Sequence, residues 1–154
     1  MDGTEAEIGG WRHEVVKDGA WAGWILYGSD PFEAHAGPFY FKLEDDGQPV
    51  CAFRAEPRHM NGGGFMHGGA IMTFADYCIF VFGREVLQDS RSVTATFNCE
   101  FVGAVPLGSL VEGRGEVIKA GRSMVFLRGL ITTGGEPVMS FSAVIKKTAP
   151  RPRA

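Results

Sequence analysis

The sequence predicts an α+β fold in which one long central helix is wrapped by a curved antiparallel sheet. Three observations support this prediction. The run 69–87 is long enough for a helix and apolar nearly all round, as expected for a helix buried on most sides. Two short strand-like runs precede it, and four follow it, joined by turn sequences. Such a sheet has edges and a face still to be covered, and a second copy of the chain would cover them.

The runs 39–44 and 50–56 flank the turn sequence DDGQP, which predicts a hairpin closed by Pro57. In the predicted helix, Gly83 is a weak point. An interior glycine costs about 1 kcal/mol relative to alanine, so we expect the helix to end or loosen there.

After the helix, apolar and polar residues alternate, which predicts a half-buried strand. The apolar side would comprise Val93, Ala95, Phe97, Cys99 and Phe101. Further strands are predicted over 109–119, 123–132 and 138–146, joined by hairpin turns. On the last of them, one face would be formed by Met139, Phe141, Ala143 and Ile145.

A chain of 154 residues fits one domain that buries its own core. We expect that domain to span 36–147. Residues 1–35 contain all three tryptophans without a clean period, and they are predicted to form an N-terminal extension that packs on the domain. The basic, proline-bearing segment 148–154 is predicted to be a flexible tail.

The net charge of −3 argues against a nucleic-acid partner. Cys51, Cys78 and Cys99 lack metal-like spacing and lie in apolar stretches, which favours a reducing compartment. The first residues lack an apolar signal core, and no apolar run is long enough to cross a bilayer. We therefore expect a cytoplasmic protein without a membrane partner.

The stretch HMNGGGFMHGGAIMTFAD, residues 59–76, combines a glycine-rich loop with the start of the helix. Gly68 and Gly69 would expose backbone N–H groups at the positive end of the helix dipole. Such a pair could bind a phosphate or a developing oxyanion, and glycines alone do not decide between them. A Walker lysine and a Rossmann spacing are both absent, which disfavours the phosphate.

Asp76 is the one carboxylate in the first part of the apolar helix. Burial would raise its pKa and make it a better base. The alternative is a structural aspartate that bonds a neighbouring hydroxyl or faces solvent. Gly68 and Asp76 are eight residues apart, roughly 12 Å along one helix, so they cannot both reach one carbonyl from the same chain. If both act, two subunits form the site.

The spacing of Asn61, His67-Gly68-Gly69 and Asp76 resembles the signature of the hotdog-fold acyl-CoA thioesterases. The match is to the phenylacetic-acid-pathway type, within the 4-hydroxybenzoyl-CoA thioesterase superfamily, over roughly 39–147. The resemblance implies that Asp76 is the catalytic carboxylate, as general base or as nucleophile. It further implies that the Gly68 N–H polarises the thioester carbonyl and that Asn61 and His67 orient the thioester or the water.

The resemblance also places Thr94 where relatives carry a serine or threonine that positions the water. Alternatively, Thr94 is only a polar strand residue in a row with Thr96 and Asn98. The turn KAGRS resembles the place where relatives meet the nucleotide of coenzyme A, so coenzyme A contacts are expected at Gly69, Arg122 and Ser123. Arg122 could equally be a solvated hairpin residue.

These features predict hydrolysis of an acyl-CoA thioester to a carboxylic acid and free coenzyme A. Coenzyme A would be part of the substrate, so no separate cofactor is expected, and a metal site at His59 and His67 is not expected either. The alternative is a non-catalytic module that binds acyl-CoA or a small ligand on the same fold. A homodimer or a dimer of dimers is expected. The sequence does not identify the acyl group or explain the extra run Gly62–Gly64. The N-terminal segment could act as a lid or as an oligomer contact.

Overall fold

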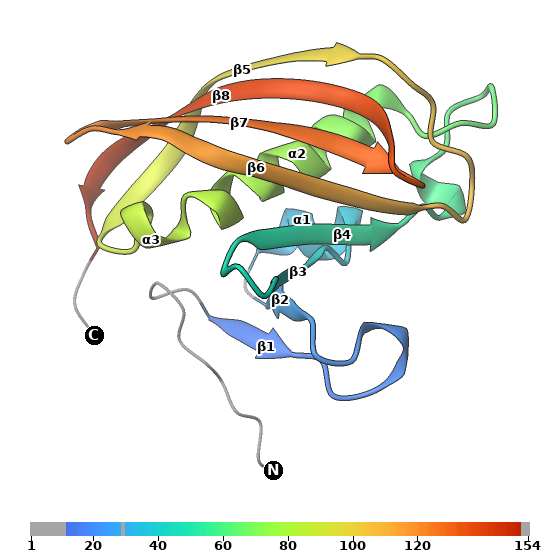
Figure 1. Cartoon of the computed structure of the whole chain (residues 1–154), viewed down its shortest axis with the longest axis horizontal. Coiled ribbons are helices and arrows are strands. Elements are labelled where there is room, and N and C mark those ends of the chain that lie inside the picture. The colour runs from blue at the N-terminus through green and yellow to red at the C-terminus, as the bar shows by residue number, and fades with distance from the viewer. Residues whose placement is uncertain (1–11, 29, 152–154) are drawn as a thin grey trace.

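A single antiparallel sheet curves around one long helix (Figure 1). The computed structural model describes residues 12–28 and 30–151. In spatial order, the strands are β1 (His13–Val15), β2 (Ile25–Tyr27), β3 (Tyr40–Leu43), β4 (Pro49–Arg54), β6 (Leu110–Ala120), β7 (Met124–Thr133), β8 (Glu136–Pro150) and β5 (Ser90–Phe101). The helices are α1 (Pro31–Ala36), α2 (Gly68–Phe82) and α3 (Arg84–Leu87), with short 3-10 turns η1 (Gly19–Trp21) and η2 (Pro57–His59). The predicted α+β architecture is confirmed.

The central helix α2 begins and ends where local chemistry requires it. His67 caps its first turn by accepting a hydrogen bond at Nδ1 from the Gly69 N–H, at 2.9 Å. At the other end the chain leaves α2 at Gly83 and restarts as α3, which confirms the predicted weak point. A Cβ on Gly83 would lie 3.0 Å from the Leu87 side chain. None of the described helices is long and apolar enough to span a membrane.

Between α2 and the sheet, three phenylalanine rings form a stack. Phe141 of β8 lies between Phe97 and Phe82, with centroid distances of 5.8 and 6.5 Å and interplanar angles of 13°. Gly129 and Gly115 lie beneath these rings, where a Cβ would collide with Phe141 and Phe82 respectively. The predicted buried face of β8 is confirmed for all its members, namely Met139, Phe141, Ala143 and Ile145.

Strand β5 departs from the predicted alternation. Its register against β8 shifts between Thr94 and Thr96, so Ala95 is an extra, bulged residue. Thr94 therefore faces α2 before the bulge, and Phe97 faces the core after it. Val93 and Phe101 are each 51% exposed and Ala95 is exposed, so placing these three residues on the buried face was wrong. The bulge comes from pairing with β8, which a period-two pattern does not encode.

Part of the N-terminal segment extends the sheet rather than only packing on it. Strands β1 and β2 pair with each other, and β2 pairs with β3. Trp21 stacks on Tyr40 of β3 at 4.2 Å, and Trp24 meets Trp21 edge-on at 5.2 Å. The predicted boundary at residue 36 falls on the last residue of α1, while Trp11 lies outside the described residues.

At the other terminus, β8 is longer than predicted. It continues through Pro150, which pairs with Ser90, and the Arg151 N–H donates to the Asp89 carbonyl at 2.9 Å. Residues 148–151 are thus tied to the start of β5, because backbone pairing outweighs the local effect of proline at the strand end. The remaining part of the predicted flexible tail, residues 152–154, lies outside the described residues.

Candidate active site

Asp76 lies midway along α2 with its side chain partly buried. The Thr94 hydroxyl donates to Asp76 Oδ1 at 2.6 Å, so the bulge in β5 directs Thr94 to this carboxylate. Burial is the main cause that raises the pKa of Asp76; the Thr94 hydrogen bond opposes it, and the charge of Asp30 adds to it. The pKa is raised on balance, which strengthens the carboxylate as a base.

The Asp76 carboxylate borders a hollow of about 350 Å³. Three elements form its walls: α1 with the residue that caps it, the middle of α2, and β5. Its lining consists of Asp30, Phe32, Glu33, Met72, Thr73, Asp76, Tyr77 and Phe97. An apolar hollow with few convergent polar groups and a carboxylate of raised pKa is the usual form of a small-molecule site.

A second set of predicted residues lies at the start of α2. The Ala70 and Ile71 N–H groups donate to the His67 carbonyl, and the Gly69 N–H is taken by the His67 ring. No described residue accepts a hydrogen bond from the Gly68 N–H. Of the two glycines, Gly68 is therefore the one whose backbone N–H can donate to a ligand oxygen.

The Phe101 ring packs against Gly68. A Cβ on Gly68 would lie 3.1 Å from Phe101 Cζ, which is closer than ordinary contact. Glycine therefore lets the ring and a ligand approach the same stretch of backbone.

Asn61 organises the glycine-rich loop. Its Oδ1 accepts from the Gly63 N–H at 2.8 Å and from the Phe65 N–H at 3.2 Å. Gly64 has a φ of +84°, a conformation that favours glycine. This turn accounts for part of the extra glycine run, because the loop must fold back on Asn61 before the helix begins.

His59 has a structural role that the sequence did not reveal. Its Nδ1 accepts from the Glu56 N–H at 3.0 Å, so the ring proton is on Nε2, which lies 2.7 Å from the Ala36 carbonyl. The His59 carbonyl in turn accepts from the His67 N–H at 2.8 Å. This buried histidine therefore joins the end of α1 to the start of α2.

The predicted site residues form two groups in one chain. Asp76 and Thr94 meet at the hollow, whereas Asn61, His67 and Gly68 lie at the start of α2. Eight helical residues, about 12 Å, separate the two groups. The geometry within one chain therefore keeps the carboxylate and the backbone donor apart.

Of the three predicted coenzyme A residues, Gly69 lies in the first turn of α2 and the other two lie elsewhere. Arg122 and Ser123 are exposed in the turn between β6 and β7, at the end of the sheet opposite to the start of α2 (Figure 1). The Ser123 carbonyl accepts from the Lys147 N–H at 2.9 Å. A single chain thus brings neither residue to Gly68.

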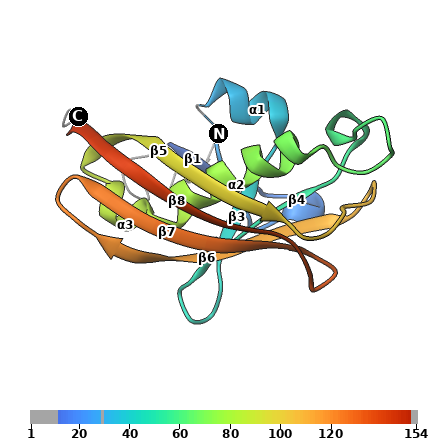
Figure 2. The same ribbon diagram turned by 90° about the horizontal axis from the view of Figure 1, so that it is seen from above.

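Strand β5 forms one edge of the sheet, next to β8 (Figure 2). Among the described strands it pairs with β8 alone, which leaves one side of a 12-residue strand unpaired. Apolar side chains near its ends are exposed, among them Val93, Phe101 and Val102. A long edge of this kind is a template for pairing with another chain.

Two further carboxylates at the hollow were missed from the sequence. Glu33 of α1 has its pKa raised to about 7, first by burial and then by the charges of Asp30 and Asp76. Asp30 and Pro31 are a helix-start signal that could have located α1. The position of Glu33 beside Asp76 is a tertiary contact, and no local sequence signal indicates it.

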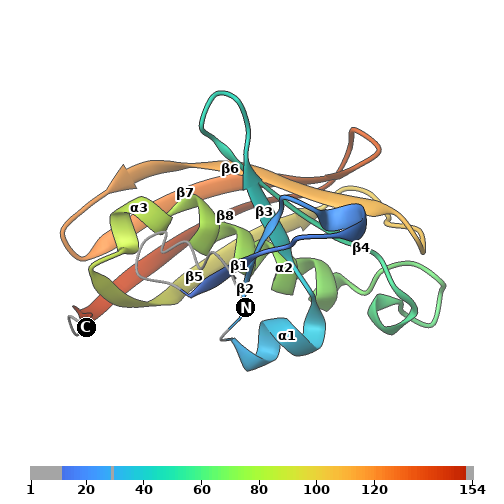
Figure 3. The same ribbon diagram turned by 90° about the horizontal axis from the view of Figure 1, so that it is seen from below.

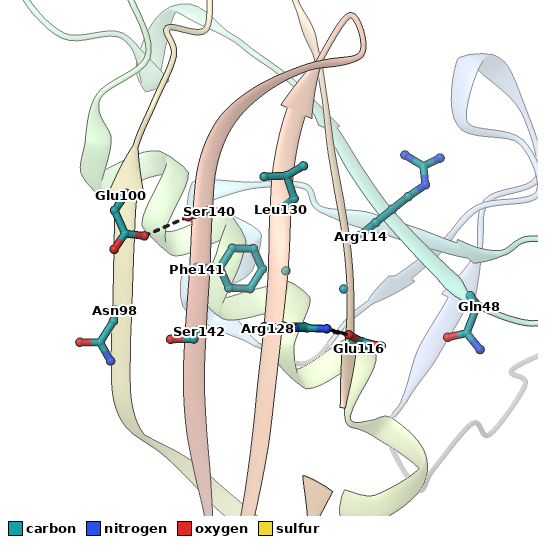
Figure 4. A pocket seen from close by; sticks show the side chains of 12 residues that line it. Gln48, Asn98, Glu100, Arg114, Glu116, Arg128, Leu130, Ser140, Phe141 and Ser142 are labelled. Carbon is teal, nitrogen blue, oxygen red and sulfur yellow. Dashed lines mark hydrogen bonds and ion pairs between the residues drawn. The ribbon is translucent and has the colours of Figure 1, made fainter. Parts of the chain in front are cut away.

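A larger hollow, of about 690 Å³, lies on the face of the sheet turned away from α2 (Figure 4). Its arginines are paired, Arg128 with Glu116 at 2.6 Å and Arg114 with Glu44 at 2.9 Å. The Ser140 hydroxyl donates to Glu100 Oε2 at 2.9 Å. It contains none of the predicted catalytic residues. We therefore place the candidate site at Asp76 despite the smaller volume.

The wrapped helix, with a carboxylate midway along it and a bare backbone donor at its first residue, defines a protein of the hotdog-fold class. Residues 63–140 match the family model described as Thioesterase superfamily. The chain belongs to this superfamily, which confirms the resemblance. "Putative esterase PA0474" of Pseudomonas aeruginosa is 33% identical over 122 residues, covering 77% of this chain and 90% of that protein.

Solved structures show the same fold. The Escherichia coli PaaI protein of the phenylacetic acid degradation operon has a TM-score of 0.69 at 16% identity, covering 79% of this chain and 87% of that one. A hypothetical thioesterase protein of Streptococcus pneumoniae, solved with coenzyme A, has a TM-score of 0.63 at 22% identity, covering 74% and 88%. The Streptococcus mutans protein smu.793, bound to acetyl-CoA, has a TM-score of 0.64 at 19% identity, covering 74% and 91%.

Proposed function

We propose that this protein hydrolyses acyl-CoA thioesters to a carboxylic acid and free coenzyme A. The observation that carries the proposal is the Asp76 carboxylate, which borders an apolar hollow and is held by the Thr94 hydroxyl at 2.6 Å. Membership of the thioesterase superfamily supports it. So do the coenzyme A and acetyl-CoA bound to two proteins of the same fold.

In the proposed reaction, Asp76 acts as a general base. Thr94 occupies Oδ1, and no described residue donates to Oδ2, which therefore remains for a water molecule. The carboxylate takes a proton from this water while the water oxygen bonds to the thioester carbonyl carbon. The carbon–sulfur bond then breaks, and coenzyme A leaves as the thiolate. The raised pKa favours the proton transfer.

The oxyanion donor in this proposal comes from a second copy of the chain. Twofold pairing of two β5 edges would set two α2 helices beside each other in opposite directions, because the Asp76–Thr94 contact places α2 next to β5. The Gly68 N–H of one copy would then face Asp76 of the other and stabilise the tetrahedral intermediate. His67 and Asn61 would hold that donor by shaping the start of α2.

The same pairing gives Arg122 a role. Its turn lies at the end of the sheet opposite to Gly68, so in an antiparallel pair it would lie on the side of the second copy's Gly68. An exposed guanidinium there suits a coenzyme A phosphate, with Ser123 beside it.

Release of free thiol from a panel of acyl-CoAs tests the proposal. Wild-type protein should release thiol, whereas Asp76→Asn should not, with dimer and fold retained by light scattering and circular dichroism. Asp45→Asn, in the exposed turn before β4, is the matched control and should keep wild-type activity. Saturable binding of acyl-CoA without thiol release would instead establish the non-catalytic binding module.

A further inference from the structure

Helix α1 supplies one wall of the Asp76 hollow. It lies beside α2 (Figure 3), outside residues 63–140 that match the family model. Asp30 caps it by accepting from the Phe32 and Glu33 N–H groups at 2.9 and 3.0 Å. This wall and its side chains therefore lie outside the matched family segment.

The far end of α1 is fixed as well. The Arg58 guanidinium donates to the His35 carbonyl at 2.9 Å and also to the Gly37 carbonyl. His59 bonds the carbonyl between them, that of Ala36. Hydrogen bonds thus hold the backbone of α1 at both ends, and they fix the position of this helix against α2.

Most of the surface that lines the hollow is apolar, and the charged groups in it are all negative. Asp30, Glu33 and Asp76 line it, and its lining includes no lysine, arginine or histidine. The pKa of Glu33 is raised to about 7 by burial and then by the other two carboxylates, which means that the hollow resists further negative charge. A cation in the same space would be attracted by all three groups.

Two further features of the lining suit a cationic ligand. Tyr77 is only 2% exposed, and its hydroxyl has no hydrogen-bond partner among the described residues. A buried polar group without a partner is costly, and a contact with a ligand would relieve that cost. Phe32, Phe97 and Tyr77 also bring aromatic rings to the hollow, and aromatic faces attract cations.

We propose that the α1 wall makes this hollow select acyl groups by charge. An acyl group that ends in a cation is preferred over a neutral group of the same shape, and one that ends in a carboxylate is rejected. Glu33 is the specificity-determining residue, because Asp30 is exposed and already uses one oxygen as the helix cap. The inference rests on the proposed function, since the hollow receives the acyl group only if Asp76 serves the thioester carbon.

Three thioesters of similar length test this selection. They are trimethylammonio-butanoyl-CoA, its neutral isostere with a tert-butyl group in place of the trimethylammonium group, and glutaryl-CoA. With Glu33 ionised, at about pH 8, wild-type kcat/KM should be at least about tenfold higher for the cationic than for the neutral thioester. Glutaryl-CoA should be the poorest of the three.

The Glu33→Gln variant keeps the shape of the wall and removes its charge. It should lower the ratio of kcat/KM for the cationic thioester to kcat/KM for the neutral thioester by about tenfold. Glu33→Ala provides a second variant if Gln does not fold. Glu136→Gln removes the same charge from the exposed first residue of β8 and should leave the preference unchanged.

The outcomes separate this inference from the proposed function. Hydrolysis of the neutral thioester with no preference for the cation, or a preference that survives in Glu33→Gln, overturns the charge selection and leaves the thioesterase proposal standing. If wild-type protein hydrolyses none of the three, the proposed function fails. Equilibrium binding of the same thioesters then decides the charge selection, and equal affinities overturn it.

Discussion

The two helical walls of the Asp76 hollow, α1 and α2, differ in how they are held in place. Helix α2 buries eight of its residues in the core, whereas α1 buries none. Packing in the core therefore fixes where α2 lies. Helix α1 is held instead by its Asp30 cap and by hydrogen bonds from Arg58 and His59. The wall that carries Asp76 belongs to the family segment, and the wall that carries Glu33 does not.

This difference indicates a division of roles. The proposed chemistry needs a carboxylate at a fixed place, and a helix packed in the core provides it. Selection among acyl groups can be changed without disturbing that core, because α1 depends on few contacts. Four predictions test whether the walls are separable in this way.

Asp76→Asn should have the largest effect. An amide cannot accept the proton from water, so kcat should fall by about 10³-fold. The fold should persist, because the substitution retains the shape of the side chain and removes a partly buried charge. Thiol release measures the rate, and circular dichroism checks the fold. A folded variant with undiminished turnover would show that Asp76 on α2 is not the catalytic carboxylate.

His59→Ala should detach the α1 wall. The Glu56 N–H and the Ala36 carbonyl would both lose their partner in a buried site, so the free energy of unfolding should fall by about 2–4 kcal/mol. KM should rise more than kcat falls, since Asp76 stays in place. Urea unfolding and steady-state kinetics measure these effects. His35→Ala, exposed on α1, is the control, and an equal loss in both variants would contradict the assigned role.

Thr94→Val should shift the pH dependence of catalysis. The Thr94 hydrogen bond lowers the pKa of Asp76, so its loss raises that pKa further. The base is active when ionised, so the rising limb of kcat/KM should move to higher pH. Activity on that limb should therefore fall at any given pH. Thr96→Val, exposed on the same strand, should leave the limb unmoved; a shift there too would show that strand disruption, not the hydroxyl, is responsible.

Glu33→Gln should have the smallest effect, seen in stability. The folded state raises the pKa of Glu33 from 4.5 to about 7, so it binds the proton more tightly than the unfolded chain. The stability from this group is complete below pH 4.5 and is lost as pH rises through about 7. Glutamine does not titrate, so the decline in unfolding free energy across this window should be about 1 kcal/mol shallower. Identical declines in both proteins would place Glu33 outside the charged hollow.

Local signals predicted several elements well. The break at Gly83 and the buried face of β8 depend on intrinsic preference and on period two, which act within a few residues. The bulge at Ala95 has no such signal, because the pairing with β8 creates it. Helix α1 had its start signal in Asp30 and Pro31, but the absence of an apolar period concealed it.

The sequence by itself determined the separation of Gly68 from Asp76, because helix geometry converts eight residues into a distance whatever the rest of the chain does. It thereby predicted that one chain cannot hold both parts of the proposed site. Only the tertiary structure decided that Thr94 meets Asp76 and that Glu33 faces it. Those contacts join residues distant in the chain, and strand register and the hydrogen bonds around His59 set them.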